Sequence, residues 1–417
     1  MKKLILTVSV IVMTAIPAMA SDFAPALDMS GNLTYPSVVS NATTPEEKLS
    51  GSGNLAASCM FNTDFLPQLW LIPTVTSDYS NTAQPLNIED QRFLFSEWLD
   101  LYASYGANYD LGKDWELKLR GFIRSDFSKQ TANEVTGKGL YDYVDHGFYL
   151  ETAKEFMSGE TDNNMTAGVK YIDRRFRNYT TLLSQSTAVT TTPNNYTKEL
   201  DNLIYTAYLG DELTFGKSGW TGTITFNYDY IPYLEQKLID PSGALEAGRR
   251  VDKTGTLTMD FPYLGANKSG VDFQYILIRT TSNQDYYDTM GTTDMSDDVY
   301  TKGYYDSIEN TGKFSVTYEF PWKLFSVYSP LATLSFSLDS VSYDNRFAKD
   351  STGAYTAQKQ KDSNYTVGFD LKQNITEWWL WYLDVNYTRY SSNMKYEALG
   401  LYNYAYLTIS LGTGISF

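Results

Sequence analysis

Strict alternation of apolar and polar residues, repeated in one stretch after another, most constrains what this chain can fold into. In residues 331–342, Leu334, Phe336 and Leu338 share one side of an extended chain and alternate with Thr, Ser and Asp. A period of two is that of a β-strand with one apolar face. Such stretches span roughly the 9–11 residues that a tilted strand needs to cross a bilayer. The pattern predicts an all-β chain.

Between residues 64 and 417 we count fourteen such stretches, joined alternately by short turns and long polar loops. Short inner turns and long outer loops are typical of transmembrane β-barrels. The sequence therefore predicts an antiparallel, up-and-down transmembrane β-barrel over residues 64–417. Twelve or sixteen strands are the alternatives, because the first stretch contains Pro67 and Pro73. The predicted strands are Leu66–Asp78, Phe95–Asp110, Trp115–Phe127, Tyr143–Phe156, Asn164–Asn178, Leu200–Leu209, Trp220–Tyr230, Lys253–Leu264, Val271–Thr280, Gly312–Phe320, Leu331–Ser342, Tyr365–Gln373, Trp378–Ser391 and Tyr402–Phe417.

The last of these stretches keeps its alternation to the final residue, with Leu411 and Ile415 on the apolar side before Phe417. It resembles the C-terminal signature of bacterial outer-membrane β-barrel proteins, which end in Phe. The resemblance implies that these three residues act as an assembly signal for the barrel-insertion machinery. We expect this strand to close the barrel against Leu66–Asp78.

The N-terminus reads as a secretory signal peptide over residues 1–20. Lys2 and Lys3 precede the apolar run Leu4–Ile16, and Ala18-Met19-Ala20 forms a small-x-small cleavage site. The run is too short to span a membrane as a helix. Cleavage near Ala20, combined with the barrel, predicts the outer membrane of a Gram-negative-type bacterium as the location.

Residues 21–63 are rich in Ser, Asn, Thr, Ala and Pro and show no sustained period. This composition favours a polar periplasmic lead-in, with a small plug inside the barrel as the alternative.

Composition supports the barrel and excludes some partners. The chain carries 35 Tyr, 21 Phe and 8 Trp, yet its mean hydropathy is −0.34, which fits an apolar outer face with aromatic girdles around a wet interior. The net charge of −16 and the lack of a basic cluster argue against nucleic acid as a partner. The single Cys59 excludes an internal disulfide.

The polar sides of the predicted strands carry charges that we expect to line the lumen. Basic and acidic residues fall on different strands, so they could form opposed walls that filter solutes by charge. Local pairing within a wet lumen is the alternative. The basic set is Lys118, Arg120, Arg124, Lys170 and Arg174. The acidic set is Asp229, Asp260, Asp272, Glu319, Asp339, Asp370 and Asp384.

Signals for catalysis are weak. His146 is the only histidine, and no serine neighbours it as a hydrolase would require. Acidic and tyrosine-rich residues 281–311 could bind calcium or sugars, but a solvated outer loop that narrows the pore explains them more simply. No catalytic residue, metal or cofactor is implied.

The sequence as a whole resembles the broad outer-membrane porin and channel class, which implies diffusion of small hydrophilic solutes or ions. Outer-membrane lipid and the insertion machinery are the expected partners, and a homo-oligomer is an open alternative to a monomer. A fatty-acid-type transport barrel is the second reading, although that family's Asn-Pro-Ala-type motif and glycine-rich plug are absent from residues 21–62. A surface adhesion or assembly barrel acting through its outer loops is the third.

Overall fold

The protein consists of β-strands and their connections. The computed structural model describes residues 23–40, 50–63, 66–84, 94–129, 137–179, 198–265, 268–290, 296–323, 327–396 and 402–416. Among these residues, no helix is long and apolar enough to cross a membrane. The strands are β1 (Phe23–Ser40), β2 (Ser50–Thr63), β3 (Leu66–Gln84), β4 (Leu94–Gly112), β5 (Trp115–Lys129), β6 (Tyr143–Ser158), β7 (Thr161–Phe176), β8 (Asn202–Phe215), β9 (Thr221–Ile239), β10 (Leu245–Leu264), β11 (Gly270–Ser282), β12 (Tyr286–Asp288), β13 (Val299–Thr301), β14 (Ser307–Glu319), β15 (Leu331–Lys349), β16 (Tyr355–Asn374), β17 (Trp379–Ser392) and β18 (Tyr404–Ser416).

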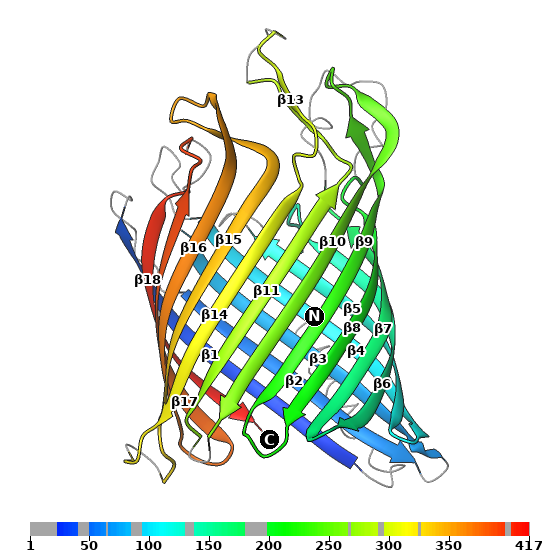
Figure 1. Cartoon of the computed structure of the whole chain (residues 1–417), viewed down its shortest axis with the longest axis vertical. Helices are drawn as coiled ribbons and strands as arrows, with labels where there is room; N and C mark the ends of the chain where they lie inside the picture. Colours follow the sequence, from blue (N-terminus) through cyan, green and yellow to red (C-terminus); the bar gives the residue numbers. More distant parts are fainter. Residues whose placement is uncertain are drawn as a thin grey trace.

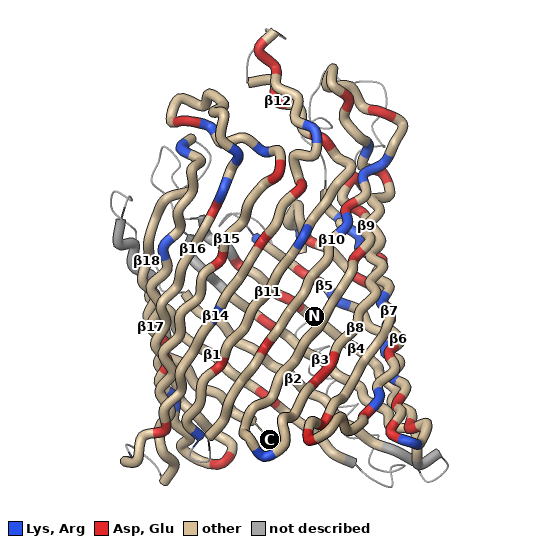
Figure 2. Tube along the Cα trace, in the orientation of Figure 1, with Lys and Arg blue, Asp and Glu red and all other residues tan. Residues whose placement is uncertain are grey.

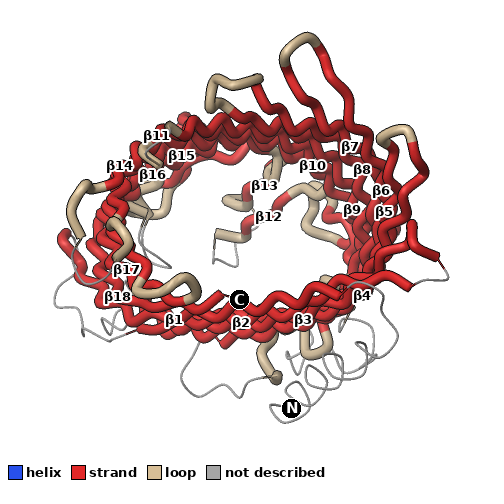
Figure 3. The backbone as a smooth tube through the Cα atoms, turned by 90° about the horizontal axis from the view of Figure 1, so that it is seen from below, coloured by secondary structure: helices blue, strands red, loops and turns tan. Residues whose placement is uncertain are grey.

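Sixteen of these strands close into one antiparallel barrel (Figures 1 and 3). Strands follow one another around the ring in sequence order, with β14 next to β11. The ring closes where β18 pairs with β1, from Asp28 opposite Ser416 to Ser40 opposite Ala405. β12 and β13 form a separate hairpin between β11 and β14. The predicted fold class, an antiparallel up-and-down barrel, is confirmed.

The predicted count of fourteen strands is wrong, because residues 23–63 supply two strands of the wall. β1 pairs with β2 over residues 23–34, so this segment is neither a lead-in nor a plug. The last strand therefore closes the ring against β1, two strands before the expected partner at residues 66–78. Hydrogen bonds between paired strands join backbone groups, so segments with small and polar side chains can form strands without the apolar alternation seen in the others. Residues 1–20 and Phe417 lie outside the described residues.

Two outer connections are also shorter than predicted. Residues 231–252 and 343–364 are not long loops, since β9 and β10, and likewise β15 and β16, continue through them as paired strands. Asp240 and Asp350 close the two tight turns, each accepting two backbone N–H groups and a hydroxyl at 2.6–3.1 Å. These bonds hold the pKa of both exposed carboxyls below their usual range. Gly243 and Gly353 supply the positive φ angles, 79° and 90°.

The strands β9, β10 and β11 are repeated as β15, β16 and β17. The offset is 110 residues, seen in the starts of β9 and β15 (221 and 331), the ends of β10 and β16 (264 and 374), and the ends of β11 and β17 (282 and 392). The turns at Asp240 and Asp350 obey the same offset. This part of the wall is therefore built from two structurally equivalent units.

Apolar side chains cover the outside of the barrel. Leu33, Leu119, Leu334 and Leu411 are 51–60% exposed, whereas the buried polar and charged residues outnumber the buried hydrophobic ones in the described part of the chain. A water-soluble protein places its large apolar residues in the opposite way. A bilayer is the solvent that makes this arrangement favourable, and Leu411 and Ile415 of the final strand belong to the same outer face.

Candidate functional site in the barrel lumen

The charged residues that the sequence assigns to the lumen all lie on the inner face of the wall. On β5, Leu119 and Ile123 are exposed on the outer surface, so Lys118, Arg120 and Arg124 point the other way. Figure 2 marks the charged residues along the strands. A barrel of sixteen strands is wide enough to enclose an aqueous lumen. His146 lies on the outer face of β6, with Ile123 and Asp173 as its strand partners.

Two of the predicted basic residues lie on either side of one buried carboxylate. Asp145 on β6 is opposite Arg124 of β5 and Arg174 of β7, and only 1% of its surface is exposed. Arg174 donates to both oxygens of Asp145 at 2.9 Å. Arg124 turns toward β4, where its Nε donates to Asp100 at 2.6 Å. Both guanidinium groups are thus paired with acids.

The other three basic residues differ in their partners. Lys118 forms an ion pair with Glu151 at 3.2 Å. Arg120 and Lys170 lie over aromatic rings, 5.3 and 5.5 Å from the ring centroids, and form no ion pair among the described residues. The acids Asp100, Asp126, Asp145 and Glu151 were absent from the predicted set, although each lies on the polar side of a predicted strand. Charges on β4–β7 are therefore largely balanced by local pairing.

The predicted acidic residues occupy the remaining inner wall, from β9 to β17, and their arrangement reflects the 110-residue repeat. Asp229 and Asp339 are equivalent positions, as are Asp260 and Asp370. Asp370 is directly opposite Asp384. None of the seven predicted acids forms an ion pair within the described residues, and Thr206 donates a hydrogen bond of 2.5 Å to Asp229. Lys313 and Lys372 share this face, next to Asp260 and Asp370, so acidic side chains outnumber basic ones on this part of the inner wall.

The hairpin β12–β13 stands above the rim of the barrel (Figure 1) and projects over the lumen when seen along the axis (Figure 3). Asp288 fastens it to the far side of β14, accepting hydrogen bonds of 2.6 Å from Lys349 of β15 and Tyr355 of β16. Tyr304 stacks on Arg346, whose guanidinium carbon lies 4.2 Å from the ring centroid. The prediction that residues 281–311 narrow the pore requires the hairpin to stay over the lumen, and the contacts of Asp288 and Tyr304 hold it there.

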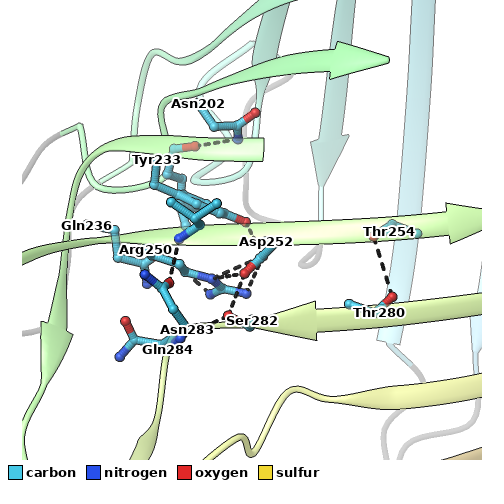
Figure 4. A network of polar contacts seen from close by, with 12 residues as sticks. Asn202, Tyr233, Gln236, Arg250, Asp252, Thr254, Thr280, Ser282, Asn283 and Gln284 are labelled. Carbon is cyan, nitrogen blue, oxygen red and sulfur yellow. Dashed lines mark hydrogen bonds and ion pairs between the residues drawn. The ribbon is translucent and has the colours of Figure 1, made fainter. Parts of the chain in front are cut away.

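A second group of contacts fastens the base of the hairpin to β9 and β10 (Figure 4). Arg250 donates to Asp252 at 2.7–3.1 Å, and Ser282 donates to the same carboxylate at 2.6 Å. The guanidinium carbon of Arg250 lies 4.7 and 4.6 Å from the ring centroids of Tyr233 and Tyr305. The hairpin is therefore held by the strands on both of its flanks, β9 and β10 beside β11, and β15 and β16 beside β14.

In the described part of residues 281–311, Asp285, Asp288 and Asp298 accept hydrogen bonds from neighbouring side chains. Tyr300 donates to Asp285 and Tyr287 donates to Asp298. The hydrogen bond to Asp285 is the main cause that raises the pKa of Tyr300 to about 12. Among the described residues, no group of three or more His, Cys, Asp or Glu side chains is arranged to hold a metal ion.

A closed antiparallel barrel with an apolar outer face and a charged inner face has the architecture of a transmembrane β-barrel. No protein-family model matches the sequence, and no curated protein sequence matches it. The fold is similar to that of solved structures. Pseudomonas putida OprB is 10% identical over 97% of this chain and 96% of its own, with a TM-score of 0.48. Acinetobacter baumannii OccAB4 is 10% identical over 96% and 99%, with a TM-score of 0.45. CdiB from Acinetobacter baumannii is 11% identical over 94% of this chain, which spans 60% of that protein's length, with a TM-score of 0.44. At these identities the similarity is one of fold alone.

Acidification is expected to release the hairpin from β15 and β16. Burial by itself raises the pKa of Asp288, but the bonds from Lys349 and Tyr355 outweigh burial and leave the pKa below its ordinary value. A lowered pKa means that these contacts stabilise the docked hairpin above the ordinary carboxyl pKa, about 4, and are lost as the pH falls through the lower folded value. A spin label at Ser296→Cys in a Cys59→Ser background should therefore gain mobility below about pH 4.

Asp288→Asn should show the mobile spectrum already at pH 7. Asp110→Asn alters an exposed carboxylate at the turn between β4 and β5, far from the hairpin, and serves as the control. Label mobility that is the same in Asp288→Asn and in the parent at pH 7 would contradict the role of this ion pair.

Proposed function

We propose that the protein is an outer-membrane channel through which small hydrophilic solutes or ions diffuse, with a preference for cations. The observation that carries the proposal is the charge of the inner wall. Seven carboxylates from β9 to β17 form no ion pair within the described residues, while the charges of β4–β7 largely pair with one another. Lys313 and Lys372 offset part of this charge, and the remaining excess of carboxylates along a water-filled path favours cations and disfavours anions.

Conductance in planar bilayers tests the proposal. The purified protein should give ohmic steps in potassium chloride, with potassium more permeant than chloride. Reversing two lumen charges, Asp339→Lys with Asp384→Lys, should lower the potassium-to-chloride permeability ratio by roughly threefold or more, because two negative charges of the wall become positive. The reversal potential in a salt gradient measures this ratio.

Asp173→Lys is the matched control for charge reversal. Asp173 lies on the outer face of β7, where it pairs with Arg175. We expect its reversal to leave the permeability ratio unchanged. Folded protein without conductance would refute the channel proposal, and an unchanged ratio in the double variant would remove Asp339 and Asp384 from the selectivity site.

The alternative functions have less support. The fatty-acid alternative rests on a count of fourteen strands and on an N-terminal lead-in, whereas the ring has sixteen strands and includes β1 and β2. Adhesion or assembly through the outer loops would be favoured if the hairpin blocks the lumen. Outer-membrane lipid and the insertion machinery are the partners this proposal requires, and a homo-oligomer is compatible with it.

A further inference from the structure

The two copies of the repeated unit end at the outer mouth in the same network of hydrogen bonds. Ser282 donates to Asp252 at 2.6 Å in the first copy, and Ser392 donates to Asp362 at 2.5 Å in the second. In each copy the asparagine after the serine bonds to the backbone of the facing strand at 2.6–3.0 Å. Asp252 and Asp362 therefore occupy equivalent positions.

The first copy contains its own guanidinium group. Arg250 is bound to Asp252 beside Tyr233 (Figure 4). Its guanidinium group also lies over the ring of Tyr305. Gln236 accepts a further bond from Arg250 at 3.5 Å. A carboxylate and two aromatic faces are the contacts that favour a planar cation.

The second copy has glutamine in place of that arginine. Gln360, the counterpart of Arg250, donates to Asp362 at 2.8 and 3.1 Å. Arg346, the counterpart of Gln236, stacks instead on Tyr343, with its guanidinium carbon 3.9 Å from the ring centroid. The described hydrogen-bond partners of Asp362 are thus uncharged, and its charge is not balanced by an ion pair within the described residues.

A cavity of about 240 Å³ borders this carboxylate on the lumen side. Tyr402 lines this cavity and precedes Asn403, whose side chain accepts a hydrogen bond of 3.0 Å from the backbone N–H of Ser392. In the first copy Tyr305 precedes Asp306, which accepts the equivalent bond of 2.8 Å from Ser282. Tyr402 is therefore the counterpart of a ring that contacts Arg250. The other lining residues used here are Asp339, Asn364, Tyr390 and Tyr404.

We propose that this cavity binds the guanidinium group of a small solute, which takes the place of Arg250 beside the carboxylate, whereas Arg346 covers Tyr343, the counterpart of Tyr233. Asp362 and Asp339 supply negative charge, and Tyr402 supplies an aromatic wall like that of Tyr305. The inference rests on the proposed channel function and names its solute class as small organic cations that carry a guanidinium group. Binding at the mouth raises the local concentration of such a solute above the lumen.

Calorimetry on the detergent-folded protein tests the site without requiring conductance. Methylguanidinium should bind saturably at one site per chain, and N-methylurea, its uncharged isostere, should not. Gln360→Arg places a guanidinium group beside Asp362 and should weaken methylguanidinium binding at least tenfold. Asp362→Asn should do the same. Thr254→Arg adds the same charge at the first copy's counterpart of Asn364 and should change the affinity less than twofold.

Each outcome is decisive once heat-modifiable gel migration shows that the variants fold. Absence of saturable binding to the wild type, or equal binding by Gln360→Arg, would overturn the inference. Equal weakening by Gln360→Arg and Thr254→Arg would also overturn it, because the effect would then be general repulsion in the lumen. Binding without conductance would support the cation site and refute the channel, whereas conductance without binding would do the reverse.

Discussion

Deletion of residues 23–63 is expected to abolish barrel assembly and to lower the yield of folded protein by more than about tenfold. The deletion removes β1 and β2 and leaves β3 and β18 with unpaired edges. Lipid cannot satisfy the exposed backbone groups of such edges, and β3 and β18 are not positioned to pair with each other. Heat-modifiable migration on gels, in which the folded barrel runs differently from the unfolded chain, measures the yield.

Deletion of residues 286–301 is the matched control. The range contains β12 and β13, which lie outside the closed sheet. The barrel should fold at close to the wild-type yield without them. A normal yield from the deletion of residues 23–63 would contradict the sixteen-stranded ring and return this segment to the role of a lead-in.

Asp145→Asn is expected to destabilise the barrel by about 2 kcal/mol, less than the loss of a fully dry ion pair because the lumen is wet. Asp145 is 1% exposed and bonds to both guanidinium nitrogens of Arg174 that face it. The substitution keeps the shape of the side chain but leaves Arg174 without its charge partner. Urea unfolding in detergent, followed by tryptophan fluorescence, measures the free energy of unfolding.

Asp173→Asn is the control for Asp145→Asn. Asp173 pairs with Arg175 on the outer face, where the two side chains are 30% and 41% exposed. Arg175 also pairs with Asp201 at 3.4 Å and keeps that partner in the variant, so we expect a loss of less than about 1 kcal/mol. Equal effects of the two substitutions would mean that Asp145 contributes no more to stability than an acid whose arginine partner has a second carboxylate.

Asp145→Asn should also lower the potassium-to-chloride permeability ratio, because it removes one negative charge beside Arg124 and Arg174. Destabilisation without such a shift would place the pair in the wall and outside the ion path.

The alternation of residues determined the class of fold. Leu334, Phe336 and Leu338 mark one strand of an apolar outer face, and the same pattern in other stretches predicted an antiparallel barrel in a membrane. The inner position of residues such as Lys118 and Asp384 followed from the same period of two, because neighbouring side chains of a strand point to opposite faces.

Only the tertiary structure decided the number of strands and the partners of the charges. β1 and β2 are rich in small and polar residues and show no strong alternation, so the local sequence does not mark them as strands. Their place in the wall is defined by backbone pairing with β18 and β3. The pairing of Arg174 with Asp145 depends on the register between β6 and β7, and the contact of Arg250 with Tyr305 joins a strand to a loop. The turns at Asp240 and Asp350 are 110 residues apart in the sequence, but only the bounds and pairing of the strands show that β9–β11 and β15–β17 are equivalent units. Local periodicity fixes which side of a strand is apolar, whereas register and ring closure arise from contacts between distant segments.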